Sequence, residues 1–186
     1  MQNFNEVKES IIAVAKQAGI CSQGYTQLKE AKSFKDLCNV AKGAFEWCVE
    51  SKVLTPEFIQ AHLKECNAEG IFLNQDVTAG YCLVTSFSEI RADEHSFVYV
   101  MENGIVDAHD STYVIATDNA EVTAYDFAHV KAKGNSGVIA NDFVTVLASE
   151  SAKVDALFHS YVIYSDNAEV TQYDHSMVVK GKLFEK

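Results

Sequence analysis

YVIATDNAEVTAYDFA at residues 113–128 recurs as YVIYSDNAEVTQYDHS at residues 161–176, 48 positions later and identical at eleven of sixteen positions. The two stretches belong to one longer pattern. From about residue 82 a valine or isoleucine stands at every eighth position: Ile90, Val98, Val106, Val114, Val122, Val130, Val138, Val146, Val154, Val162, Val170 and Val178. Alanine follows two positions later in eight of these twelve octads, which read x-V-x-A-x-[D/E/G]-x-[A/S]. Self-similarity at a fixed short period is the sequence signature of a solenoid.

The octads alternate between two types at their seventh position. One type carries Asn103, Asn119, Asn135, Ser151 and Asn167, and the other carries His95, Ser111, Phe127, Phe143, His159 and His175. The structural repeat is therefore sixteen residues, and the two quoted stretches lie three coils apart. Side chains alternate along a strand, so valine and alanine at positions two and four point inward. The small alanine requires two close walls, which predicts a flattened, two-sided coil.

The first 70 residues have the features of helices. Ser33 and Asp36 form a capping-box pattern at the start of an apolar stripe, and Thr55 followed by Pro56 marks a second helix start. A first helix is expected over about residues 4–18, and Gly70 is expected to end the last one. The predicted fold class is α+β, with a small N-terminal α-helical domain at residues 1–76. A two-sided β-solenoid (β-helix) of about six 16-residue coils follows at residues 77–186.

Charge and composition restrict the partners and the compartment. Of the net charge of −11, residues 82–186 carry −9 and residues 1–81 carry −2. This balance argues against direct contact with nucleic acid or an anionic membrane and favours a protein partner with a basic surface. No apolar run reaches the roughly 18 residues that a membrane helix needs, and no secretory signal pattern is present. The five cysteines form no CxxC pair. We expect a reduced, cytoplasmic protein, in the host cell cytoplasm if a phage encodes it.

Position six of the octad is acidic in most coils. We call these residues the acidic ladder: Glu94, Glu102, Asp110, Asp118, Asp126, Asp142, Glu150, Asp166 and Asp174. Aspartate at a turn can hydrogen-bond its own backbone two residues on, so the ladder is explained by turn formation alone. The other interpretation is a charged surface for a partner, with one charge per roughly 2.4 Å of rod if both rows count. Duplex DNA carries one per about 1.7 Å.

The outward positions of one strand row are apolar in most coils. We call this set the apolar face: Phe97, Tyr99, Tyr113, Ile115, Leu147, Tyr161 and Ile163. A patch of this composition is too large for a solitary monomer to leave exposed. Either the helical half or another chain is expected to cover it, and we expect homo-oligomer formation, as a homodimer, through this face.

Catalytic, metal and cofactor motifs are missing from the sequence. G-x-S-x-G, H-E-x-x-H, Walker and Rossmann patterns do not occur, and neither does the calcium-binding nonapeptide. His159 and His175 lie one coil apart beside Asp174, which is too few groups for a metal site. We therefore predict no catalytic residue, no metal and no cofactor, and hence no enzyme.

The octad run over about residues 82–180 resembles the V-x-A-x-[D/G]-N-A repeats of small proteins that bacteriophages and mobile elements encode, often behind a helical N-terminus. Its acidic rod is similar in principle to the pentapeptide-repeat proteins that mimic DNA, although the A-[D/N]-L-x-x pattern is absent. The resemblance implies a non-enzymatic inhibitor, such as an anti-CRISPR-like anti-defence factor, that binds a host nucleic-acid-handling protein. The alternative is a self-associating structural scaffold or a virion or accessory component. An acyltransferase of the hexapeptide-repeat class does not fit the period of eight.

Overall fold

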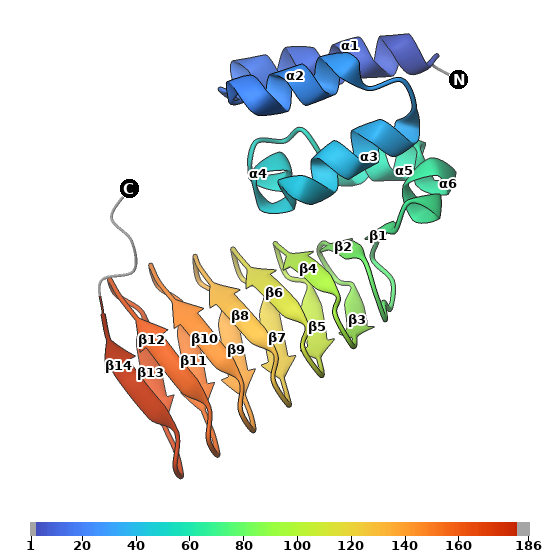
Figure 1. The fold of residues 1–186 in the computed structure, drawn as a ribbon. Coiled ribbons are helices and arrows are strands. Elements are labelled where there is room, and N and C mark those ends of the chain that lie inside the picture. Colours follow the sequence, from blue (N-terminus) through green and yellow to red (C-terminus); the bar gives the residue numbers. More distant parts are fainter. Residues whose placement is uncertain (1–2, 182–186) are drawn as a thin grey trace. The chain divides into compact units, whose positions relative to one another are not determined.

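The computed structural model describes residues 3–181, and it confirms the predicted α+β architecture. The chain divides into two compact units, residues 1–73 and residues 74–186. The first unit is helical and the second is a parallel β-solenoid (Figure 1).

Six short helices make up the first unit. Their bounds are α1 Phe4–Gln17, α2 Ser22–Glu30, α3 Phe34–Gly43, α4 Phe45–Glu50, α5 Pro56–Ala61 and α6 Leu63–Ala68. Strand β1, Ile71–Leu73, follows them.

Four of the six helices, α1, α2, α3 and α5, begin at a side chain that caps backbone N–H groups, and α4 and α6 have no such cap. Ser33 caps α3 by accepting from the Asp36 N–H, and Asp36 Oδ2 accepts from the Ser33 hydroxyl at 2.9 Å. Thr55 caps α5, with Pro56 at the first helical position. These two starts are where the sequence predicts them. Two breaks are not predicted: the helix that begins at Phe34 ends at Gly43 and restarts as α4, and the one that begins at Pro56 restarts as α6 after His62.

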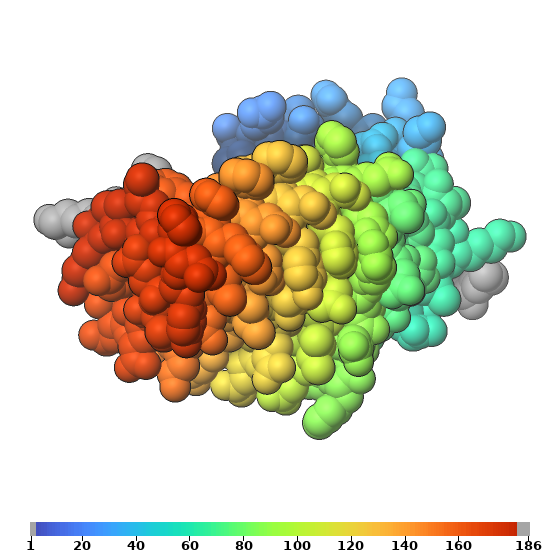
Figure 2. Space-filling view, turned by 90° about the horizontal axis from the view of Figure 1, so that it is seen from below, coloured from blue at the N-terminus to red at the C-terminus, as the bar shows by residue number. Residues whose placement is uncertain are grey.

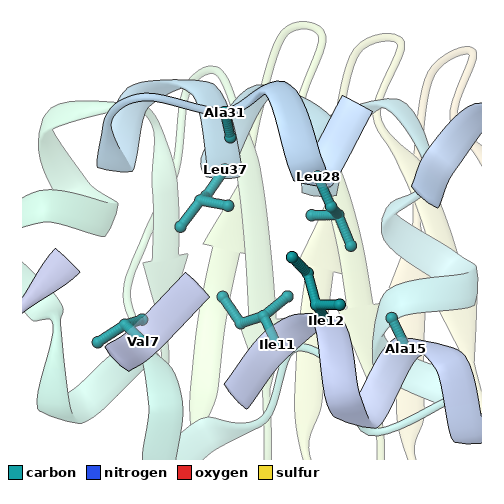
Figure 3. Packing of buried hydrophobic residues seen from close by; sticks show 7 residues of the cluster. All are labelled: Val7, Ile11, Ile12, Ala15, Leu28, Ala31 and Leu37. Atoms are coloured by element: carbon teal, nitrogen blue, oxygen red, sulfur yellow. The ribbon is translucent and has the colours of Figure 1, made fainter. Parts of the chain in front are cut away.

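The helical unit has its own apolar core. The buried cluster consists of Val7, Ile11, Ile12, Ala15, Leu28, Ala31 and Leu37. Figure 3 shows Ile11 and Ile12 of α1 facing Leu28 of α2 and Leu37 of α3. Because helices of six to fourteen residues are marginal alone, this shared core stabilises them.

The solenoid strands are four residues each and form two parallel sheets. The first sheet has the order β1-β2-β4-β6-β8-β10-β12-β14 and the second the order β13-β11-β9-β7-β5-β3. The strands of the first sheet are β2 Tyr81–Val84, β4 Phe97–Val100, β6 Tyr113–Ala116, β8 His129–Ala132, β10 Thr145–Ala148, β12 Tyr161–Tyr164 and β14 Met177–Lys180. Those of the second are β3 Glu89–Ala92, β5 Ile105–Ala108, β7 Glu121–Ala124, β9 Gly137–Ala140, β11 Lys153–Ala156 and β13 Glu169–Gln172. Figure 2 shows the coils as successive colour bands from green to red.

Paired residues in neighbouring strands of each sheet are sixteen positions apart in the sequence. Val114 pairs with Val98 on one side and Val130 on the other, so every residue stacks on its equivalent in the next coil. Positions two and four point inward as predicted, and Val114, Ala116 and Ala124 are completely buried. The small inward residues allow the two sheets to pack closely.

In one coil a larger side chain at one inward position is compensated by a smaller residue at another. Val100 replaces the usual alanine at position four, and Gly104 takes the place at position eight that Ala120 occupies one coil later. A Cβ on Gly104 would lie 2.8 Å from Cγ2 of Val100, closer than any normal contact. The glycine therefore accommodates the larger valine.

The inward positions change character at the C-terminal end of the described rod. Tyr164 is half-buried, and Gln172 and Lys180 are exposed where earlier coils have buried alanine. Val170 and Val178 are also only half-buried. The narrow apolar core thus ends in the last described coil, as the sequence predicts.

Candidate interaction surface

Each coil has two corners, and both corners turn in the same way. We call the turn from an odd-numbered to an even-numbered strand the first corner and the reverse turn the second corner. At the first corner Ala128 N–H donates to the Tyr125 carbonyl at 3.1 Å, and at the second Ala120 N–H donates to Thr117 at 3.1 Å. Position six follows the strand end, so the acidic ladder is split into one row at each corner.

All nine residues of the acidic ladder have left-handed backbone, with φ between 50° and 60°. Few side chains tolerate this region, and aspartate is among the better ones. At the second corner Gly134 occupies the same position with φ of 65°. The turn conformation therefore accounts for part of the residue choice at position six.

The carboxylates of the ladder hydrogen-bond to the neighbouring coil. Asp126 Oδ2 accepts from the backbone N–H of Asp110 at 3.1 Å, and Asp118 Oδ2 accepts from Glu102 N–H at 3.1 Å. The same bond joins Asp110 to Glu94, Asp142 to Asp126, Glu150 to Gly134 and Asp166 to Glu150. The sequence suggested a bond within the same turn. The acceptor instead reaches a turn sixteen residues earlier, because the in-register stack places equivalent N–H groups directly beside each carboxylate.

One oxygen of each carboxylate accounts for these bonds, whereas an ionised carboxylate can accept about four. Glu94, Glu102, Asp110, Asp118, Glu150, Asp166 and Asp174 are exposed, and Asp126 and Asp142 are half-buried. Hydrogen bonds from the hydroxyl and the backbone N–H of Ser86 lower the pKa of Glu102, which keeps it charged. The ladder is therefore a structural element that still presents negative charge to solvent.

A row of stacked rings runs beside the acidic row at the first corner. We call Phe127, Phe143, His159 and His175, all at position seven, the corner ring ladder. Successive ring centroids are 5.6, 5.4 and 5.7 Å apart, with interplanar angles of 12°, 20° and 23°. Phe127 is 60% exposed and Phe143 56%. The rings cover one another's faces, so the apolar edges of the two phenylalanines face solvent.

Position five adds a second ring stack at the same corner. His109 and Tyr125 stack at 4.7 Å with an interplanar angle of 9°, and His109 Nδ1 lies 3.9 Å from Asp126 Oδ2. Asp126 and Asp174 thus have a ring-bearing residue on both sides, and Asp110 and Asp142 have one on a single side. The first corner combines apolar area and negative charge along one line.

The residues of the apolar face all lie at outward positions of the first sheet, as predicted. Tyr99 and Ile115 are buried, and Phe97, Tyr113, Leu147, Tyr161 and Ile163 are half-buried. Phe97 stacks between Tyr81 and Tyr113, with centroids 5.5 and 5.0 Å away. Met177 and Val179 continue the same outward row on β14 and are 61% and 41% exposed.

Within residues 3–181 no group of three or more His, Cys, Asp or Glu side chains could hold a metal ion. His159 and His175 instead take part in the corner ring ladder, in which each ring lies against its neighbour. In the same described range no helix is both long and apolar enough to cross a membrane.

The helical unit contains a cavity of about 830 Å³ that no sequence pattern predicted. Its walls include the single tryptophan of the chain, Trp47, and three buried cysteines, Cys38, Cys48 and Cys66. Cys38 lies on α3, Trp47 and Cys48 on α4 and Cys66 on α6, with no shared period, so only the clustering of cysteines and tryptophan in this half pointed to them.

No protein-family model, curated protein or solved structure matches this chain at significant similarity.

Proposed function

We propose that this protein is a non-enzymatic protein-binding module whose first solenoid corner captures a basic segment of a partner protein. The observation that carries the proposal is the corner ring ladder, exposed beside Asp126, Asp142 and Asp174. Lysine and arginine lay their aliphatic stems over apolar surface while their charged heads reach a carboxylate. The corner ring ladder provides apolar surface for the stem, and the carboxylates of Asp126, Asp142 and Asp174, each one residue before a ring, provide a partner for the charged head.

The partner class follows from the charge and from the resemblance of the octad repeat. A host nucleic-acid-handling protein has a basic groove for phosphates, and two acidic rows on a narrow rod are complementary to it. In this proposal the protein is an anti-defence inhibitor of phage or mobile-element origin, of the anti-CRISPR-like kind, that acts in the host cytoplasm.

The experiment compares capture of basic proteins from host lysate by two variants that lose equal charge. In the corner variant Asp110, Asp126, Asp142 and Asp174 become Asn. In the control Glu89 and Glu169 become Gln, Glu121 becomes Gln and Asp155 becomes Asn, all on exposed outward positions of the second sheet. The corner variant should fold normally, bind the captured partner with slower association and show a flatter salt dependence. Equal capture and equal salt slopes for both variants would reject the proposal.

The second candidate is a scaffold that self-associates through the apolar face, and Met177 and Val179, exposed in the same outward row, favour it. Lysine in place of Tyr161 and Ile163 should then lower the oligomeric mass in light scattering while circular dichroism stays unchanged. Lysine in place of Thr171 on the other sheet is the control. An unchanged oligomeric mass for the Tyr161 and Ile163 variant would reject the scaffold as a function.

A further inference from the structure

The cavity of the helical unit is large for the unit that contains it. Its lining runs from Ile11 of α1 to Ile71 of β1, and its volume is about 830 Å³. Protein interiors contain few voids larger than a water molecule. An empty closed cavity of this size would cost more free energy than a domain's whole folding stability. The space is therefore open to solvent or holds another molecule.

Aromatic and aliphatic side chains form its walls. Phe34, Trp47 and Phe58 are half-buried there, and Leu28 and Leu37 are buried. The His62 ring fixes two of the aromatic rings, with its centroid 5.0 Å from that of Phe34 and 4.8 Å from that of Phe58. The wall is thus pre-formed, as in most small-molecule sites.

Polar groups lie at the surface of the cavity. Gln23 and Gln27 on α2 are exposed, and so are the charged Glu30 and Lys32. Asp36 is half-buried and already accepts from the Lys32 backbone N–H at 2.8 Å and from the Ser33 hydroxyl. No charged side chain of the lining is buried, so a buried charge on a ligand would have no partner, which is costly.

Three buried thiols complete the wall. Burial raises the pKa of Cys48 to about 11. The hydrogen bond between Cys38 and Cys66, together with burial, raises the pKa of Cys66, and the same hydrogen bond lowers the pKa of Cys38. Buried, protonated thiols are polarizable apolar groups and weak nucleophiles. Cys48 and Cys66 therefore favour non-covalent packing against a ligand.

We propose that this cavity binds a small, uncharged molecule that carries an aromatic ring, with the ring between Phe34, Trp47 and Phe58 and a polar end at Gln23 and Gln27. The volume lies within the range of roughly 300–1,000 Å³ that is usual for such sites. The proposal is independent of the function proposed for the solenoid, since every lining residue belongs to the helical unit.

The test uses N-phenyl-1-naphthylamine, a neutral aromatic amine whose fluorescence rises in apolar surroundings. Trp47 is the only tryptophan, so its emission reports on this cavity directly. Saturable quenching of Trp47, with one probe bound per chain, is the expected result. Absence of saturable binding would overturn the proposal. Quenching that follows protein concentration rather than probe concentration would also overturn it, by indicating contact between copies.

Two phenylalanine variants on α3 separate the cavity from the general surface. Val40→Phe narrows the cavity and should weaken probe binding about tenfold or more. Lys35→Phe adds the same ring at an exposed position outside the lining and should leave binding unchanged. Equal affinity of the two variants would contradict the assignment.

Thiol protection in the unmodified chain gives a second readout that needs no variant. Saturating probe should slow alkylation of Cys48 by N-ethylmaleimide several-fold, as measured by peptide mass spectrometry. Cys82, buried in strand β2 of the solenoid, is the internal control and should keep its rate. If the probe left the alkylation rate of Cys48 unchanged, or slowed alkylation of Cys48 and Cys82 equally, binding in this cavity would be contradicted.

Discussion

The Oδ2 atom of Asp126 accepts a hydrogen bond of 3.1 Å from the backbone N–H of Asp110, which occupies the same position one coil earlier. Asp142 repeats the bond with the N–H of Asp126 at 3.3 Å. The side chains that give the rod its charge thus also join its coils. Because Asn keeps the acceptor and loses the charge, cohesion and charge can be separated by substitution.

Asp126→Ala should destabilise the solenoid, whereas Asp126→Asn should not. Alanine leaves the Asp110 N–H without its acceptor and places a poorly suited residue in left-handed backbone, at a cost of about 1–3 kcal/mol. Asparagine tolerates this backbone and still accepts. Urea denaturation followed by circular dichroism measures the difference. Identical midpoints for the alanine variant and the unchanged chain would show that the bond contributes nothing.

Ala124→Phe should overfill the core between the two sheets. Ala124 is completely buried at an inward position of β7, and a large ring there should cost about 1–3 kcal/mol or more. Glu121→Phe, on the same strand but exposed, is the matched control. Thermal melting checks both, and a melting temperature of Ala124→Phe equal to that of the control would contradict the narrow core.

Gly104→Ala should destabilise, and adding Val100→Ala should restore much of the loss. The new Cβ would lie 2.8 Å from Val100 Cγ2, a clash that costs about 1–3 kcal/mol. The double variant recreates the pair Ala116 and Ala120 of the next coil, where both residues are fully buried. The two changes should therefore couple strongly in a double-mutant cycle. Additive losses would disprove this compensation.

Alkaline pH should weaken the folded state through its buried thiols. Desolvation raises the pKa of Cys48 from 9.0 to about 11, and the unfolded chain exposes the thiol at its ordinary value. A pKa raised in the folded state stabilises it fully below pH 9 and less as the pH rises toward 11. Two pKa units correspond to roughly 3 kcal/mol. Cys48→Ala should flatten the decline in unfolding free energy between pH 8 and pH 11, and Cys21→Ala, exposed, should not. If the unfolding free energy of Cys48→Ala fell with pH as steeply as that of the unchanged chain, the buried thiol would not be the cause of the decline.

Much of the solenoid could be predicted because its contacts recur at one separation. Each residue of the rod stacks on a residue sixteen positions away, so Val114, Ala116 and Asp126 have the same neighbours as their counterparts in other coils. A nearest-neighbour architecture of this kind repeats its packing constraints in the sequence itself. The inward valines and alanines, the turn positions and the end of the narrow core could therefore all be predicted from the sequence.

The bonding of the acidic ladder was only partly predictable. The sequence placed Asp126 at a turn, and the structure has it there. The donor that its carboxylate binds is set by the height of one coil and the direction of a left-handed turn, which bring the Asp110 N–H beside it. A pattern of residue types does not contain that geometry.

The sequence by itself determined the helical first half, the helix starts at Ser33 and Thr55, and the sixteen-residue two-sided coil, because capping and strand alternation are local and periodic. Only the tertiary structure decided the breaks after Gly43 and at His62, the coil-to-coil carboxylate bonds and the cavity around Trp47. The breaks and the cavity depend on segments that pack without a common period. The carboxylate bonds do recur every sixteen residues, but their partner is set by the left-handed turn that brings the Asp110 N–H beside Asp126. At the breaks and around the cavity, the neighbours of each residue are fixed by the folded arrangement of the chain and by no regular spacing along it.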